Sequence, residues 1–582
     1  MFDTVIRGGT IVDGTGGETF TADVAIVDGK IAEVGKVNGQ SRQSIDADGA
    51  LVTPGFIDIH THYDGQFIWD DELEPSFSNG TTTAIAGNCG VGFAPVHADM
   101  HRPLIELMEG VEEIPGIVLE EGLDWKWTSF PDYLARVSQN EFTMDVATHL
   151  PHAPLRLFVM GERALNHEPA TPEDIEQMKE HVRASMAAGA IGVSGSRILE
   201  HKSSTGEHVP GTFAEEAEML GLASAMGESG RGVFQVVPLG AAGDISGNAA
   251  SHEDRLGEHR RIERIAEASG RPVTYLLHSY DHAPGEYREL MAASEKARER
   301  GLDIVPQVAA RGLGVVLGLD SMHLFLVKPS YKEIAHLPRV ERARAMRDPE
   351  RRKRILAESA DETDGLLARR IGFFGRNISE YFVLDESLDY EPEASARIDV
   401  IAARTGRTVE EVVYDTISAG DGRQVVVKFV LNYTDGNLNS AYEMLRDPST
   451  VSGLGDGGAH LQLICDSAMT TFHLSFWSRD RQRGPTLPIE TTVNKLTGKP
   501  ADLYGLSDRG RIAVGKRADI NVVDFEKVGN EPPEMFFDLP KGGGRLLQHG
   551  RGYLATMVDG MLTRKNDHAT GARPGRLVRS TS

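Results

Sequence analysis

The stretch Thr53-Pro-Gly-Phe-Ile-Asp-Ile-His-Thr-His-Tyr-Asp64 decides the fold that we expect for this chain. Its apolar run at 56–59 is typical of a buried strand, and His60 and His62 follow at the end of that run. Residues two apart on a strand point to the same face, so both imidazoles share one side. Barrels of parallel strands collect such side chains at their carboxyl rim. The pattern predicts half of a metal site, with a surface pair of histidines as the alternative.

The overall composition is that of an acidic globular protein. The chain has 582 residues, a formal net charge of −25, and 25% charged residues. Such a charge repels nucleic acid and anionic membranes, so neither is expected as a main partner. The two cysteines are too few for a disulfide framework. Because the sequence shows no signal peptide and no apolar run long enough to cross a bilayer, we expect a cytoplasmic protein.

Both ends of the chain have the short strands and tight turns of a β-domain. Near the start, residues 22–35 alternate around the turn dipeptide Asp28-Gly29, as in a hairpin. Runs at 517–524 and 553–560 show a similar pattern near the end. We therefore predict one small β-sandwich domain built from residues 1–53 and 508–582. Two unrelated β-flaps are the alternative.

The middle of the chain alternates strand-like and helix-like segments, which gives the fold class α/β. One helix-like segment opens with Thr171, a typical N-cap, followed by Pro172 and acidic residues. Such alternation implies βα units and a parallel sheet. A (β/α)8 barrel over 54–507 is predicted from eight strand-like runs, at 56–59, 81–89, 145–150, 189–195, 232–237, 272–278, 302–307 and 451–456. Residues from about 320 to 395 break the rhythm, and we expect a helical insertion there.

Candidate metal ligands and a candidate base stand at further strand ends. Cys89 closes the second strand between glycines, His278 closes the sixth, and Asp456 closes the eighth. Thiolate and imidazole groups suit zinc, and a carboxylate facing two histidines suits a general base. Zinc activates water, and Asp456 would move its proton to a leaving nitrogen, which amounts to hydrolysis of an amide-like bond. The alternatives are that Cys89 is an inert core residue, that His278 is structural, and that the run around Asp456 is a glycine-rich turn.

Several short motifs resemble a known family. The run at 54–64 and the two-ended β-domain resemble the amidohydrolase superfamily, and motifs at 87–95, 109–116, 125–134 and 570–576 resemble the N-acyl-D-amino-acid deacylases (D-aminoacylases) within it. The resemblance covers nearly the whole chain. It implies a TIM barrel of the amidohydrolase type and one or two zinc ions, with release of a free D-amino acid and a carboxylate. By this resemblance the metal ligands are His60, His62, Cys89 and His278, and Asp456 is the catalytic acid and base.

The chain departs from that family's pattern near the substrate. Strand five carries Gln235 where the family has a histidine ligand, and Tyr280 stands where the family has a lysine near the substrate carboxylate. Arg311 is a candidate replacement anchor because arginine pairs with carboxylates through two hydrogen bonds; a surface helix-start residue is its alternative. His152, where strand three should end, is a candidate for orienting ligands or substrate, with packing in the rim as its alternative.

The sequence therefore predicts a zinc-dependent amidohydrolase acting on a small-molecule substrate, without excluding a homo-oligomer. An N-acyl-D-amino acid is the leading substrate. Two alternatives stay open. One is a cyclic amide hydrolase of the hydantoinase or dihydropyrimidinase type, which the missing strand-six lysine keeps open. The other is a non-catalytic scaffold, which the missing strand-five histidine favours and the retained ligand set opposes.

Overall fold

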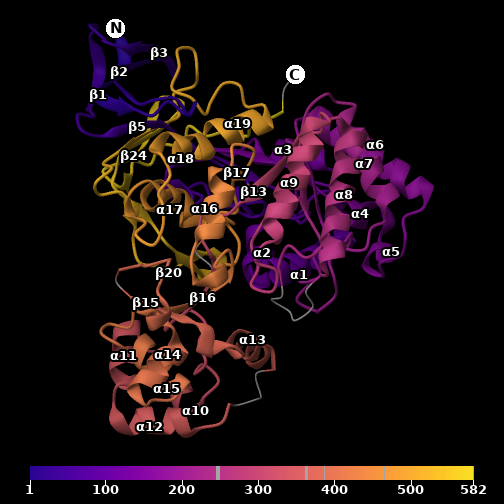
Figure 1. Cartoon of the computed structure of the whole chain (residues 1–582). Coiled ribbons are helices and arrows are strands. Elements are labelled where there is room, and N and C mark those ends of the chain that lie inside the picture. The colour runs from indigo at the N-terminus through magenta and orange to yellow at the C-terminus, as the bar shows by residue number, and fades with distance from the viewer. Residues whose placement is uncertain (244–249, 361–364, 386, 464–465, 581–582) are drawn as a thin grey trace.

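A computed structural model describes residues 1–243, 250–360, 365–385, 387–463 and 466–580 of the chain. Figure 1 shows a barrel of strands and helices, a β-domain that contains the N-terminus, and a group of helices set apart from the barrel. Within the described residues, no helix combines the length and apolar character needed to cross a membrane.

Parallel strands form the predicted barrel. In chain order they are β6 (Phe56–Asp58), β7 (Thr81–Ala86), β8 (Asp145–Thr148), β9 (Leu150–Pro151), β10 (Gly192–Ser196), β11 (Val233–Val237), β12 (Val273–Leu276), β13 (Ile304–Val308) and β17 (Val451–Ser452). Parallel ladders join neighbours from β6 to β8 and from β9 to β17. Because β8 and β9 are separated by His149 alone, they act as one strand, and the barrel has the predicted eight.

The barrel closes between its first and last strands, just beyond their carboxyl ends. The His62 N–H donates to the Gly457 carbonyl at 2.7 Å, and the Asp456 N–H donates to the His60 carbonyl at 3.0 Å. Thr61 and Gly457 form a parallel bridge at the same place. The expected α/β barrel is therefore confirmed, and the segments that close it contain His60, His62 and Asp456.

Helices cover the outside of the barrel. Among them, α6 (Pro172–Ala188), α7 (Glu216–Gly227), α8 (His252–Ser269) and α9 (Glu286–Glu299) follow one another along the wall in Figure 1. Helix α6 begins as predicted, because the Thr171 side chain accepts a hydrogen bond from the Asp174 N–H and the Asp174 carboxylate accepts one from the Thr171 N–H. Gly189 ends the helix with a φ of 105°. This capping box fixes where the helix starts.

The two ends of the chain share one nine-stranded sheet of order β25-β24-β23-β18-β5-β1-β2-β3, with β4 paired to β1. The two halves meet where β5 pairs antiparallel with β18 and Val52 faces Val522. The expected joint β-domain is therefore present, hydrogen-bonded as one continuous sheet. Its strands are β1 (Phe2–Ile11), β2 (Phe20–Val27), β3 (Lys30–Gly35), β4 (Ser41–Asp46), β5 (Leu51–Pro54), β18 (Ile520–Val523), β23 (Tyr553–Val558), β24 (Met561–Lys565) and β25 (His568–Ala569).

Between β13 and β17, the described residues of 313–431 form an inserted unit with an apolar core of its own. Leu317, Phe325, Tyr414 and Val426 belong to this core, which is distinct from the barrel core. Compared with the predicted 320–395, the unit starts earlier, ends later and contains a sheet as well as helices. Its elements are β14 (Leu313–Leu317), α10 (Pro329–Lys332), α11 (Arg339–Met346), α12 (Pro349–Ala357), α13 (Gly365–Gly375), β15 (Phe382–Leu384), α14 (Ile398–Thr405), α15 (Val409–Ile417) and β16 (Val425–Leu431).

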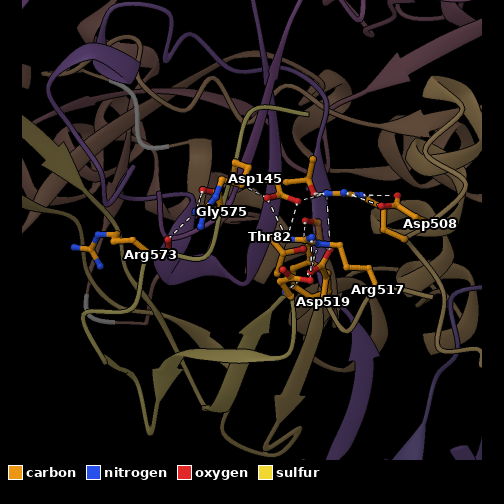
Figure 2. A network of polar contacts seen from close by, with 12 residues as sticks. Thr82, Asp145, Asp508, Arg517, Asp519, Arg573 and Gly575 are labelled. Carbon is orange, nitrogen blue, oxygen red and sulfur yellow. Dashed lines mark hydrogen bonds and ion pairs between the residues drawn. The ribbon is translucent and has the colours of Figure 1, made fainter. Parts of the chain in front are cut away.

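A buried network of ion pairs joins the barrel to the β-domain (Figure 2). Arg509 is 5% exposed, and its guanidinium lies 2.5 Å from the Asp145 carboxylate, 2.9 Å from the Thr83 hydroxyl and 3.8 Å from the Asp519 carboxylate. Arg517 reaches Asp145 at 3.2 Å and Asp519 at 3.0 Å. Because Asp145 opens β8 and Asp519 precedes β18, the network fixes the two units against each other.

The C-terminal segment also returns to the barrel. Gly575 pairs with Phe142, the Val578 N–H donates to the Val146 carbonyl at 2.7 Å, and the Ser580 N–H donates to the Gly189 carbonyl at 3.0 Å. The last described residues therefore lie beside β8, and Figure 2 shows Gly575 next to Asp145.

We expect Arg509→Met to destabilise the protein strongly. Loss of the guanidinium leaves Asp145 and Asp519 as buried carboxylates with less compensation, and breaking a buried pair costs about 3–5 kcal/mol. Arg511→Met is the matched control, because Arg511 pairs with an exposed Asp502 at 2.6 Å, and such pairs contribute about 0–1 kcal/mol. Denaturant titration measures both free energies of unfolding, and equal losses would contradict the role of the network.

Candidate active site

The two predicted histidines lie at the seam of the barrel. His60 and His62 follow β6 and are 0% and 1% exposed. The His60 Nδ1–H donates to the Gln307 Oε1 at 2.9 Å, and its Nε2 lies 3.3 Å from the Cys89 Sγ. The His62 Nε2 lies 3.9 Å from the same sulfur. Burial lowers the pKa of His60 to about 4, so its ring is neutral and has a lone pair for a metal.

Cys89 sits in a loop that depends on glycine. The φ of Cys89 is 56°, and those of Gly87 and Gly90 are 72° and 67°. A Cβ at Gly87 would lie 2.4 Å from the His149 carbonyl, so a larger residue does not fit there. The Cys89 N–H donates to the Gln235 Oε1 at 3.1 Å. Gln235, on the strand that lacks a histidine, therefore holds the cysteine loop in place.

The side chains of His60, His62 and Cys89 form a group that fits a metal ion. One ligand atom from each lies within 4.8 Å of the others, and all three residues are buried. Burial, with the negative charges of Glu112 and Asp456, raises the pKa of the Cys89 thiol well above its usual value. A thiolate at this position therefore needs a cation beside it. Two imidazoles and a sulfur are ligands that zinc prefers, so the donor set fits zinc.

Asp456 faces both histidines from the loop after β17. Its Oδ1 lies 3.5 Å from the His60 Nε2 and 3.7 Å from the His62 Nε2. Burial opposes its charged form, yet the nearby rings of His62 and His60 hold the pKa of Asp456 below its usual value. A Cβ at Gly455 would lie 2.2 Å from the Asp58 Oδ2. The glycine-rich run thus lets the carboxylate approach the histidines.

His278 faces the same cavity but lies outside the His-His-Cys group. His278 is 2% exposed, and burial lowers the pKa of its imidazole to about 4. Its Nδ1 is 3.4 Å from the Asn432 Nδ2. Within the described ranges, the structure therefore brings together His60, His62, Cys89 and Asp456, and places His278 on the cavity wall.

The three predicted substrate contacts lie in different surroundings. Tyr280 lines the cavity, and its hydroxyl donates to the Ala241 carbonyl at 3.3 Å. Arg311 is 1% exposed and forms an ion pair with Asp466 at 2.9 Å. Because this carboxylate already neutralises the guanidinium in the interior, the placement favours a structural role for Arg311 over the predicted anchor.

His152 is also held in the interior. Its Nε2 lies 2.6 Å from the Glu218 Oε1, and the Arg156 guanidinium contacts the same oxygen at 3.0 Å. All three side chains are at most 2% exposed. Packing, the alternative considered for His152, agrees better with these contacts than a role in orienting substrate.

The site opens into a cavity of about 1090 Å³. Its volume is at the upper end of pockets that bind organic ligands. The barrel supplies the reactive groups, and the inserted unit supplies much of the surface that a substrate would meet. Apolar side chains that line the cavity from the inserted unit include Leu313, Val315, Phe373, Phe429 and Leu431.

Two residues next to the group were not singled out by sequence reasoning. Gln307 holds the His60 ring, and the Glu112 Oε1 lies 3.3 Å from the His62 Nδ1. Glu112 belongs to the 109–116 motif, which supported the family resemblance but assigned no function to this residue. It follows helix α1 (His101–Val111), and its approach to His62 depends on how that helix packs.

Comparison with known proteins identifies the class. The model of the amidohydrolase family matches residues 43–563, so this chain belongs to the amidohydrolase family. Among curated relatives, the D-aminoacylase of Alcaligenes xylosoxydans xylosoxydans is 26% identical, over 100% of this chain and 98% of its own. The N-acyl-D-glutamate deacylase of the same organism is 26% identical, over 90% and 88%. The family resemblance expected from the motifs is confirmed.

Solved structures show the same fold. A D-aminoacylase structure has a TM-score of 0.65 at 22% identity and covers 100% of both chains. The N-acyl-D-glutamate deacylase from Bordetella bronchiseptica, in complex with zinc and a phosphonate inhibitor, has a TM-score of 0.63 at 22% identity, over 99% of each chain. An L-hydantoinase from Arthrobacter aurescens has a TM-score of 0.50 at 15% identity, over 100% of both.

We expect about one zinc ion per chain in the purified protein, because the described donors form one compact group of the kind that binds a single ion. Cys89→Ala removes the sulfur and should lower the zinc content, measured by elemental analysis. Tyr280→Phe is the control, since Tyr280 lines the cavity but is not one of the three grouped metal ligands. Unchanged zinc in the Cys89→Ala protein would remove the sulfur from the ligand set.

Proposed function

We propose that this protein hydrolyses the amide bond of an N-acyl-D-amino acid, with zinc as its metal. The observation that carries the proposal is the position of Asp456, 3.5 Å from the His60 Nε2, beside a buried His-His-Cys group that opens into a cavity of about 1090 Å³. The D-aminoacylase and N-acyl-D-glutamate deacylase relatives support the substrate class.

His60, His62 and Cys89 are the residues that would hold the ion. Gln307 and Gln235 support them, through the His60 ring and the Cys89 main chain. A bound zinc ion supplies Lewis acidity toward a carbonyl and makes water a better nucleophile near neutral pH. His278 as a further ligand stays a prediction.

Asp456 carries the proton in this proposal. Because its pKa is held below the usual value, the carboxylate is ionised and accepts a proton from the attacking water. The water oxygen bonds to the carbonyl carbon, the C–N bond breaks, and Asp456 returns the proton to the leaving nitrogen. The products are a carboxylic acid and an amine, so atoms and protons balance.

The alternatives have less support. The D-aminoacylase aligns with 100% of this chain, whereas an allantoinase and a urease subunit align with 15% and 16%. A scaffold that had lost its chemistry has no need of three buried donors grouped within 4.8 Å beside a carboxylate. A linear N-acyl-D-amino acid is therefore the first choice.

A small molecule is the expected partner of this site. The net charge of −25 opposes nucleic acid and anionic membranes as partners. A cytoplasmic location and a homo-oligomer stay predictions.

We expect Asp456→Asn to lower kcat/KM for an N-acyl-D-amino acid by about 10²–10⁴-fold, the usual contribution of a general acid and base. The unfolding midpoint should stay near that of the parent. Asp281→Asn is the control, because Asp281 is a carboxylate of the cavity wall outside the His-His-Cys group. Unchanged turnover in the Asp456→Asn protein would exclude this carboxylate from the mechanism.

A substrate panel tests the reaction class. N-Acyl-D-amino acids, their L enantiomers and a hydantoin are compared by kcat/KM on zinc-loaded protein, and the D compounds should be hydrolysed fastest. Faster turnover of the hydantoin would establish the cyclic amide alternative. Zinc binding without turnover of any compound would favour the scaffold.

A further inference from the structure

Glu112 is a buried carboxylate beside one of the proposed metal ligands. The residue is 1% exposed, and its Oε1 lies 3.3 Å from the His62 Nδ1. Neither of these two atoms has a hydrogen-bond partner among the described residues. The 3.3 Å contact therefore brings together two otherwise unsatisfied buried atoms, an imidazole nitrogen that can donate and a carboxylate oxygen that can accept.

Charge explains why this contact matters. A carboxylate at such depth is costly unless it is paired. Across the described ranges, no lysine or arginine forms an ion pair with Glu112; its close partners are the imidazoles of His62 and His460, with the His460 Nε2 3.8 Å from the Glu112 Oε2. The contact to His62 is the shorter one, so this imidazole is the main partner of the carboxylate.

We propose that Glu112 is a positioning residue that holds the His62 ring with Nδ1 protonated and Nε2 free for the metal. The inference rests on the proposed function, since it assumes that His62 binds the ion. In this orientation the Nε2 lies 3.9 Å from the Cys89 Sγ and 3.7 Å from the Asp456 Oδ1. The ring therefore presents its lone pair to the group.

The two ligand histidines are held by different acceptors. His60 donates to the neutral amide of Gln307 at 2.9 Å, whereas His62 faces the carboxylate of Glu112 at 3.3 Å. A carboxylate partner fixes the tautomer and raises the basicity of the ring more than an amide does. Glu112 thus makes His62 the stronger donor of the pair.

The main chain of Glu112 contacts the loop that carries Asp456. The His460 N–H donates to the Glu112 carbonyl at 2.6 Å. His460 lies four positions after Asp456 in the same glycine-rich run. Glu112 therefore touches His62 through its side chain and the Asp456 loop through its main chain.

The test measures zinc affinity of the metal-free, full-length protein by competition with a chromophoric chelator. Glu112→Ala should weaken zinc binding about 10–100-fold, the usual effect of removing such a partner. Glu112→Gln should have a smaller effect, because the amide oxygen still accepts but carries no charge. Glu113→Gln is the matched control, since Glu113 contacts the His460 Nδ1 at 3.5 Å and no proposed ligand.

Cobalt loading provides a readout that a general loss of structure does not produce. The ligand-field bands of bound Co²⁺ should shift in the two Glu112 variants and keep their positions in Glu113→Gln. Unfolding midpoints of the metal-free proteins show whether each variant folds. If Glu112→Ala does not fold, Glu112→Gln carries the comparison.

The outcomes separate this inference from the proposed function. Parent protein that binds zinc and hydrolyses substrate, with zinc affinity and cobalt bands unchanged in the folded Glu112 variants, overturns the role of Glu112 and leaves the function standing. Parent protein that binds no zinc overturns both. Weaker zinc binding with shifted bands in the Glu112 variants alone supports the inference.

Discussion

Two main-chain hydrogen bonds across the seam between β6 and β17 are the constraint on which the site depends. They tie His60 to Asp456 and His62 to Gly457. Because main-chain atoms make these bonds, closure of the barrel itself sets how far the carboxylate stands from the imidazoles. The glycines of the last loop allow that closure, since a Cβ at Gly455 would meet the Asp58 carboxylate. Folding of the barrel and assembly of the reactive group are therefore one event.

Features that depend on local pattern could be predicted from the sequence. The apolar run ending in His60 and His62, and the glycines around Cys89 and Asp456, each specify a strand end or a loop by themselves. Strand ends of a parallel barrel share one rim, so these four residues were expected to meet without knowledge of any contact. The pairing of the two chain ends was predictable for a similar reason, because both carry the same alternation of strands and tight turns.

Features that depend on a partner distant in sequence could not be predicted. Arg311 has the chemistry of a substrate anchor, but Asp466 neutralises it in the interior. His152 is held by Glu218 in the same way. The inserted unit was expected to be helical, yet β14 and β16 pair antiparallel and extend the unit at both of its ends in the sequence. In each case the deciding contact forms only after the tertiary fold is in place.

The sheet shared by the two chain ends has a consequence for how the protein is made. Strand β5 leads directly into β6, which His60 follows, and its antiparallel neighbour β18 is synthesised only after the whole barrel. Until then, that edge of the nascent sheet is unpaired, and exposed edges are sites where chains aggregate. That edge therefore stays unpaired while the barrel is being translated. A prematurely terminated product would keep the histidines, yet it would lack the strand that anchors the segment leading to them.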